Sequence, residues 1–178
     1  IFLLAYWFYM DGIDTIVRMA TAYGTDIGLE ASSMITALLL TQFVAFPSTL
    51  IFGHFADQVG FKKILSFGIL IYILISIFAS QITTDTGFYI IAIVVGLVMG
   101  GVQAVSRAYF SSIIPENKEA QFFGFYNLVG KSAVVAGPAL VAWISVIFNT
   151  PRAGILSLLI LFIPGLFLLW MVPNQQKS

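Results

Sequence analysis

Three charged side chains interrupt an otherwise apolar stretch near the start of the chain. Asp11, Asp14 and Arg18 come shortly after the hydrocarbon-rich run "IFLLAYW". On a helix they fall within a sector of about 60°, and Asp14 and Arg18, one turn apart, can form an ion pair. Asp11 has no such partner on its own helix, which makes it the better candidate for proton coupling. The alternative is that the cluster serves only as a structural ion pair.

The composition indicates that these charges lie in a membrane. Hydrophobic residues make up 60% of the chain, charged residues only 9%, and the mean hydropathy is +1.00. An ordinary soluble domain has about 25% charged residues, so this chain could not cover its folded surface in water. The formal net charge is zero, and without a basic patch we expect no nucleic-acid partner.

Several kinds of chemistry are excluded by the residues that the sequence lacks. There is no cysteine, and His54 is the single histidine, so we expect no metal site. The segment "GFYNLVGKS" lacks the first glycine of a phosphate-binding loop, since Phe125 stands there. With no nucleophile–base pair either, we expect no enzyme activity and no cofactor. Because the apolar run starts at Ile1 without a basic leader, we expect the chain to be part of a longer one.

Six stretches are long and apolar enough to cross a bilayer as helices, which need about 20 residues each. They are residues 1–22, 33–53, 63–80, 88–107, 120–147 and 153–172. The predicted fold class is an all-α membrane protein, a six-helix bundle. Lysine and arginine gather in alternate connections and in the tail, and the other connections carry Arg152 alone; the gathered residues are Lys62, Lys63, Arg107, Lys118 and Lys177. The positive-inside rule then predicts that both termini are cytoplasmic, in a membrane that we expect to be a bacterial inner (plasma) membrane.

An internal repeat divides the chain into two halves. "GIDTIVR" (residues 12–18) matches "GVQAVSR" (residues 101–107), and Pro47 aligns with Pro138 at a similar offset. The second half starts on the opposite side of the membrane from the first, so the repeats are predicted to have inverted topology. We place repeat 1 at approximately 1–80 and repeat 2 at approximately 88–172.

Polar residues are distributed unevenly among the predicted helices. The third and sixth helices contain no ionisable residue within the membrane and can face lipid, whereas the others carry polar residues suited to a buried cavity. The predicted substrate or ion pathway comprises Asp11, Asp14, Arg18, Gln42, Gln103, Asn127 and Lys131. For Lys131, cavity lining and charge pairing within the bundle both stay open. Gly96 and Gly100 have the spacing of close helix packing.

Charges also make the first predicted helix unfavourable in lipid by itself. Each charge costs about 2.5–3.5 kcal/mol on the insertion scale, while each Leu, Ile, Phe or Val returns only about 0.3–0.6 kcal/mol. Three charges therefore outweigh some eight strongly apolar residues. We expect this helix to be sheltered in a cavity between the repeats.

The segment "GHFADQVGFKKIL" (residues 53–65) resembles the major facilitator signature G-x-L-A-D-R-x-G-R-K-x-x-L. Gln58 and Phe61 depart from it, since they replace arginines. The resemblance implies a conformational role at the cytoplasmic side, in which Asp57 caps a neighbouring helix. The predicted gate residues are Gly53, Asp57, Gly60, Lys62 and Arg107.

The resemblance extends over the whole chain. "YWFYMDGIDTIVRMATAYG", "ALLLTQFVAFP", "GGVQAVSRAYFSSIIP" and "FFGFYNLVGKSAVVAGP" are similar to the C-terminal six helices of the vacuole-effluxer-like branch of the major facilitator superfamily. That branch has twelve helices, so the resemblance implies that the N-terminal half is absent here. It implies a secondary transporter moving a small solute by alternating access, an amino acid or similar metabolite being one candidate. The expected partners are the missing half or a second copy of this chain. The alternative function is a membrane scaffold without transport.

Overall fold

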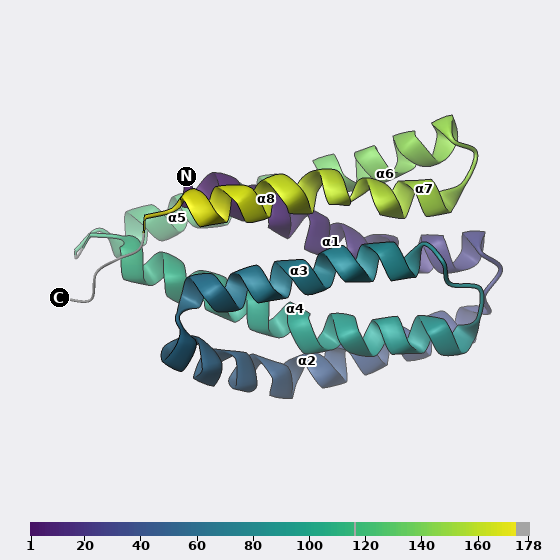
Figure 1. Cartoon of the computed structure of the whole chain (residues 1–178), viewed down its shortest axis with the longest axis horizontal. Coiled ribbons are helices and arrows are strands. Elements are labelled where there is room, and N and C mark those ends of the chain that lie inside the picture. Colours follow the sequence, from purple (N-terminus) through teal and green to yellow (C-terminus); the bar gives the residue numbers. More distant parts are fainter. Residues whose placement is uncertain (116, 174–178) are drawn as a thin grey trace.

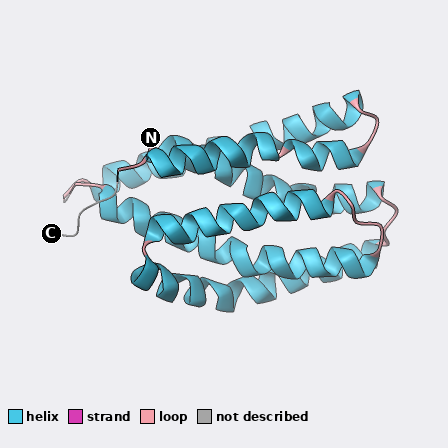
Figure 2. Cartoon of the chain, viewed as in Figure 1, coloured by secondary structure: helices cyan, strands magenta, loops and turns pink. Residues whose placement is uncertain are grey.

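The computed structural model describes residues 1–115 and 117–173, and the regular elements found there are helices (Figure 2). Lys177, which entered the orientation argument, lies outside the described residues. The helices are α1 (Phe2–Asp26), α2 (Ala31–Val59), α3 (Phe61–Ala79), α4 (Asp85–Ile113), α5 (Glu119–Ser132), α6 (Ala136–Ile147), α7 (Pro151–Ser157) and α8 (Leu159–Met171). The all-α membrane fold predicted from the sequence is confirmed.

The eight helices correspond to the six predicted spans, because α5 with α6 and α7 with α8 each form one interrupted crossing. Five stretches are long and apolar enough to cross a membrane, and α1 is the exception. Every 18-residue stretch of α1 contains Asp11, Asp14 and Arg18. The structure therefore agrees that α1 is the span that depends most on its neighbours.

Two predicted helix ends were wrong. We expected the second span to end near residue 53, but α2 continues to Val59 and stops at Gly60, whose φ of 104° suits glycine. Likewise α4 continues to Ile113 instead of ending near 107. In both places the chain leaves the apolar region before it meets a residue that breaks a helix, so the polar turns that follow remain helical.

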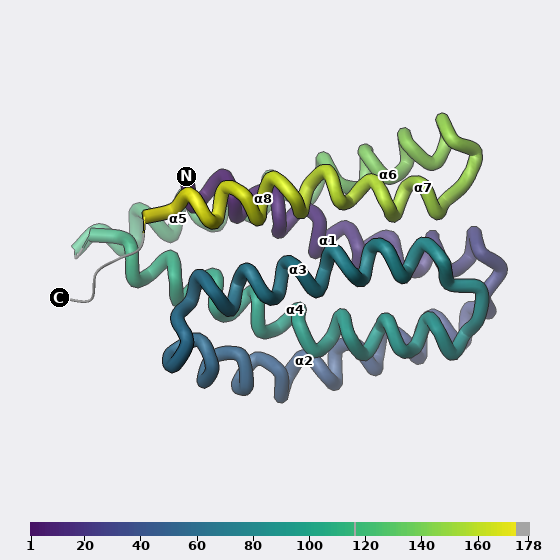
Figure 3. Tube along the Cα trace, in the orientation of Figure 1, coloured from purple at the N-terminus to yellow at the C-terminus, as the bar shows by residue number. Residues whose placement is uncertain are grey.

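The six crossings, in which α5 with α6 and α7 with α8 each count as one, run alternately in opposite directions (Figure 3). The chain begins, and α8 ends, at the same end of the bundle, where the α2–α3 and α4–α5 connections also lie (Figure 1). The connections after α1, α3 and α6 lie at the other end. Consequently α1 and α4, which carry the two copies of the repeated segment, are antiparallel, as an inverted repeat requires.

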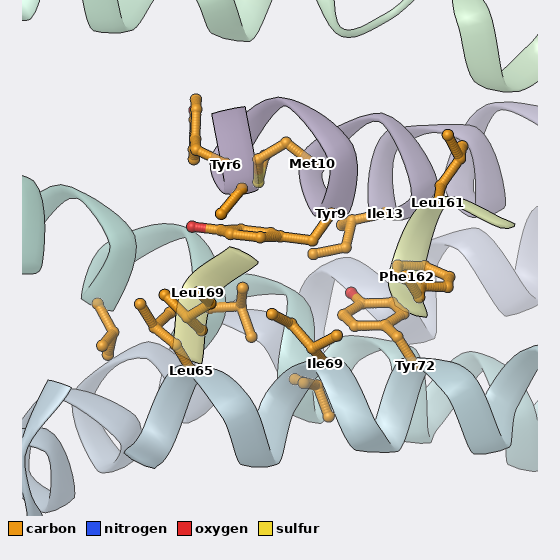
Figure 4. Close-up of a cluster of buried hydrophobic side chains, with 14 of the residues drawn as sticks. Tyr6, Tyr9, Met10, Ile13, Leu65, Ile69, Tyr72, Leu161, Phe162 and Leu169 are labelled. Carbon is orange, nitrogen blue, oxygen red and sulfur yellow. The ribbon is translucent and has the colours of Figure 1, made fainter. Parts of the chain in front are cut away.

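The core lies between α1, α3, α4 and α8. Tyr9, Tyr72 and Phe162 are fully buried there, and the last two stack with ring centroids 5.6 Å apart (Figure 4). The third and sixth spans each bury one face in this core and expose the other, for example at Leu74 and Phe167. Facing lipid is thus possible for one side of each helix only.

Helices α2 and α4 form a close contact that we call the α2–α4 seam (Thr41, Ala45, Gly96 and Gly100). A Cβ atom at Gly96 would lie 2.7 Å from the carbonyl oxygen of Thr41, and one at Gly100 would lie 2.5 Å from that of Ala45. Thr41 also donates a 3.0 Å hydrogen bond across the seam to the carbonyl of Ala92. In lipid, where apolar burial does not drive helices together, such close backbone approach is what holds them. The predicted packing role of the two glycines is confirmed.

Candidate functional site

Helix α1 places Asp11 and Thr15 on one buried face, one turn apart. Asp11 is 0% exposed and Thr15 is 1% exposed. In the described part of the chain the hydroxyl of Thr15 has no hydrogen-bond partner, and the backbone N–H of Gly137 is the donor that faces the Asp11 carboxylate. A charged or polar group without a partner in the interior is costly, so these three atoms mark α1 as more than a structural helix.

The backbone of α6 lies directly against this pair. A Cβ atom at Gly137 would lie 2.8 Å from Asp11 Oδ1 and would overlap the hydroxyl of Thr15. Gly137 belongs to the first turn of α6, immediately after residues 133–135 interrupt the fifth span. The interruption has a local cause in Pro138, which lacks an N–H group and clashes with the carbonyl four residues before it. The buried carboxylate thus faces a break in a membrane helix.

Asp14 and Arg18 lie on a more accessible side of α1. Asp14 is half-buried and Arg18 is exposed; the charge of Arg18 acts on Asp14, although no close ion pair joins them among the described residues. The charge of Asp14 nevertheless acts on the buried hydroxyl of Tyr72, which itself has no hydrogen-bond partner there. The charged cluster of α1 therefore has a buried member, Asp11, and two more accessible members, Asp14 and Arg18.

The remaining predicted pathway residues are not brought together inside the chain. Gln103 is half-buried, whereas Gln42, Asn127 and Lys131 are exposed. Asn127 and Lys131 do share one exposed face of α5, since they are one turn apart. These residues lie where another part of a larger protein could face them, not within this bundle.

A tyrosine cluster that the sequence did not predict joins α1, α4 and α5. Tyr9 exchanges a 2.8 Å hydrogen bond with Ser106, and the rings of Tyr6 and Tyr126 stack at 4.2 Å. Ser106 stands next to Arg107 in the second copy of the repeated segment. The two tyrosine hydroxyls in an apolar helix were the only sign of this cluster in the sequence. Their partners could not be predicted, because they are about 100 residues away along the chain.

The signature segment makes an unexpected contact with the end of the chain. The Lys62 ammonium donates hydrogen bonds of 2.7 Å to the carbonyls of Trp170 and Val172, and it lies 5.6 Å from the Trp170 ring centroid. These are carbonyls at the C-terminus of α8, which a cation stabilises. Asp57 is exposed, and no helix of the described chain is capped by it. Of the other gate residues, Gly53 is half-buried, and Gly60 and Arg107 are exposed.

Two cavities among the described residues are lined mainly by apolar side chains. One of about 60 Å³ lies between α1, α2, α3 and α4, and a wider groove of about 530 Å³ lies between α3 and α4. None of the predicted pathway residues lines either space. Among the described residues no group of three His, Cys, Asp or Glu could hold a metal ion.

The helical bundle and its buried carboxylate define a multi-pass integral membrane protein of the type that forms half of a major facilitator transporter. Residues 1–178 match the family described as "Vacuole effluxer Atg22 like". The chain belongs to this family of transporters.

Individual relatives agree with this assignment. An uncharacterized MFS-type transporter, YxiO, from Bacillus subtilis is 41% identical over 178 residues, which cover all of this chain and 42% of that protein. Autophagy-related protein 22 of Vanderwaltozyma polyspora is 30% identical over all of this chain and 37% of its own length. The corresponding protein of Cryptococcus neoformans is 27% identical over 92% of this chain and 32% of its own length. The chain therefore spans less than half the length of these relatives.

Proposed function

We propose that this chain supplies the C-terminal half of a secondary active transporter that moves a small solute by alternating access. The observation that carries the proposal is Asp11, a fully buried carboxylate with no cationic partner among the described residues, opposite a broken membrane helix. Ionisable groups inside a membrane and discontinuous helices are features of substrate and ion pathways. A scaffold that only held other proteins would gain nothing from this costly group.

The second span of each repeat, α2 in the first and the α5–α6 crossing in the second, indicates where the rest of the transporter lies. In their most apolar 18 residues, α2 and the α5–α6 crossing have only 22% and 17% of residues buried. The corresponding shares for α3, α4 and the α7–α8 crossing are 39% to 44%. Phe43 and Trp143, for example, are largely exposed there. Since the relatives are more than twice as long, we assign these faces to the absent N-terminal half. Gln42, Asn127 and Lys131 would then line the cavity between the halves.

The solute is proposed to be an amino acid or a similar small metabolite, because the matching family is described as a vacuole effluxer. We further propose that the protein lies in a bacterial inner membrane, with Asp57 and Lys62 at the cytoplasmic side. We also propose that the protein is not an enzyme, which the membership of a transporter family supports.

The proposal is tested by uptake of labelled amino acids into liposomes that contain the full-length protein. Asp11→Asn keeps the shape of the side chain and removes its charge, so it should abolish accumulation driven by an ion gradient while sparing exchange of solute down its own gradient. Asp26→Asn, at the exposed end of α1, is the matched control and should behave as the wild type. Normal accumulation by Asp11→Asn would show that Asp11 is not the coupling residue.

A further inference from the structure

We propose that Asp11, Thr15 and the backbone at the α5–α6 break form a binding site for a sodium ion. The inference rests on the proposed transport function, for which it names the coupling ion. It starts from three buried oxygen atoms, two on Asp11 and one on Thr15: the Thr15 hydroxyl has no hydrogen-bond partner in the described chain, and the Asp11 carboxylate is faced only by the backbone N–H of Gly137. An ion in contact with these oxygens would offset the cost of burying them.

The Thr15 hydroxyl departs from the pattern of other buried hydroxyls on these helices. Thr41, Ser76 and Ser106 each donate to the backbone carbonyl one turn earlier, at 2.9, 3.0 and 2.7 Å. That local hydrogen bond is available to any serine or threonine in a helix. Thr15 does not make it, and its hydroxyl is instead directed at Gly137, where Asp11 Oδ1 also lies. Two oxygens from different turns thus converge on one point of α6.

The break between α5 and α6 leaves backbone carbonyl groups, with partial negative charge, and backbone N–H groups, with partial positive charge, outside the helical hydrogen-bond pattern. In the described chain the carbonyls of Gly130, Lys131 and Ser132 accept no backbone hydrogen bond, whereas that of Val129 accepts one from Ala133. The released carbonyls form the negative end of α5, and the N–H groups of the first turn of α6 form a positive end that favours an ionised Asp11. Unwound carbonyls of broken membrane helices coordinate sodium ions in transporters of other folds.

The charge of this ligand set suits a monovalent cation. One carboxylate, one hydroxyl and neutral carbonyls supply hard oxygen ligands with a single negative charge, whereas divalent cations in proteins usually draw on several carboxylates. The side chain of Lys131 is exposed, so this residue offers the site its carbonyl. A proton on Asp11 would satisfy one oxygen only and would leave the released carbonyls without a role.

The test measures cation binding directly, without a solute or a transport assay. Full-length protein in detergent is unfolded thermally, followed by tryptophan fluorescence, while sodium chloride replaces choline chloride or potassium chloride at constant ionic strength. A ligand that binds the native state raises the melting temperature with its concentration. We expect a saturable rise with sodium, none with Asp11→Asn, and about a tenfold weaker apparent affinity with Thr15→Val, the loss of one contact to a charge.

Matched variants separate binding from folding. Thr15→Ser keeps the hydroxyl and should keep the sodium response, as should Thr21→Val and Asp26→Asn, which change exposed positions of the same helix. If Asp11→Asn does not fold, the comparison of Thr15→Val with Thr15→Ser still decides. Equal melting in sodium, potassium and choline, or a Thr15→Val variant that binds sodium as tightly as the wild type, would overturn the sodium site. Accumulation that persists without sodium would then leave the proposed transport function intact, with a proton as the coupling ion.

Discussion

The α2–α4 seam gives the most direct stability prediction. Gly96→Ala and Gly100→Ala would each place a Cβ atom against a backbone carbonyl oxygen, at 2.7 and 2.5 Å. Ordinary contact begins at 3.4 Å, so the helices would have to separate by 0.7 to 0.9 Å. Backbone cannot turn aside as a flexible side chain can, and overpacking of this kind costs about 1–3 kcal/mol.

A matched control removes the intrinsic effect of alanine. Gly124 also lies inside a helix, but a Cβ atom there would meet nothing within 4 Å. Alanine is favoured over glycine in helices by up to about 1 kcal/mol, so Gly124→Ala should be neutral or stabilising. After the same gain is allowed for, we expect each seam variant to lose about 0–2 kcal/mol relative to the wild type and to lie about 1–3 kcal/mol below Gly124→Ala in stability.

The assay is unfolding of the full-length protein in detergent, by temperature and by a denaturing detergent, with helix content as the readout. The three glycine variants are compared under one condition. If Gly96→Ala and Gly100→Ala are as stable as Gly124→Ala, the two helices do not approach as closely as described. The packing argument would then fail for this seam.

Three further predictions concern the connections between the helices. A single cysteine at Thr84 should react with an impermeant thiol reagent from outside and one at Gln58 only from the cytoplasm; the reverse pattern would contradict the proposed orientation. Asp57→Ala should reduce transport and leave solute binding unchanged, and equal loss of both would place Asp57 in the binding site instead. Lys62→Met should lower stability by about 1 kcal/mol or more through lost contacts with the end of α8, whereas the exposed Lys63→Met should not; equal effects would contradict that contact.

Hydropathy was sufficient to predict the six spans and their alternating directions, because both depend on the average polarity of long segments. The packing of Gly96 and Gly100 was also predictable, since small residues four apart lie on one face of a helix. The interruption at residues 133–135 was not predicted, because the fifth span was predicted as one continuous stretch, 120–147. Its extent depends on how the backbone fits against Asp11 and Thr15, and spacing along one helix does not contain that information.

Contacts between residues far apart in the chain could not be predicted from the sequence. The hydrogen bond from Tyr9 to Ser106 and those from Lys62 to the end of α8 each join residues that are about 100 positions apart. Asp14 and Arg18 show the limit in the other direction: residues one turn apart on a helix interact through their charges without forming a close ion pair among the described residues. A helix fixes which side chains share a face, whereas the neighbouring helices decide which of them pair.

Positions that match in the predicted repeat carry different residues in the two halves of the chain, and these residues make different contacts. The alignment of residues 12–18 with 101–107 pairs Asp11 with Gly100 and Pro138 approximately with Pro47. Gly100 packs against Ala45, two residues before Pro47, and α2 continues unbroken through that proline. Asp11 faces Gly137, one residue before Pro138, and there the helix is broken. One contact between the two repeats, that of α2 with α4, is therefore a close backbone seam, while the matching contact of α1 with α6 holds a buried carboxylate beside a broken helix. Since a transporter needs a rigid part against which another part moves, we infer that α2 with α4 is the rigid part and that ion binding acts on the contact between α1 and α6.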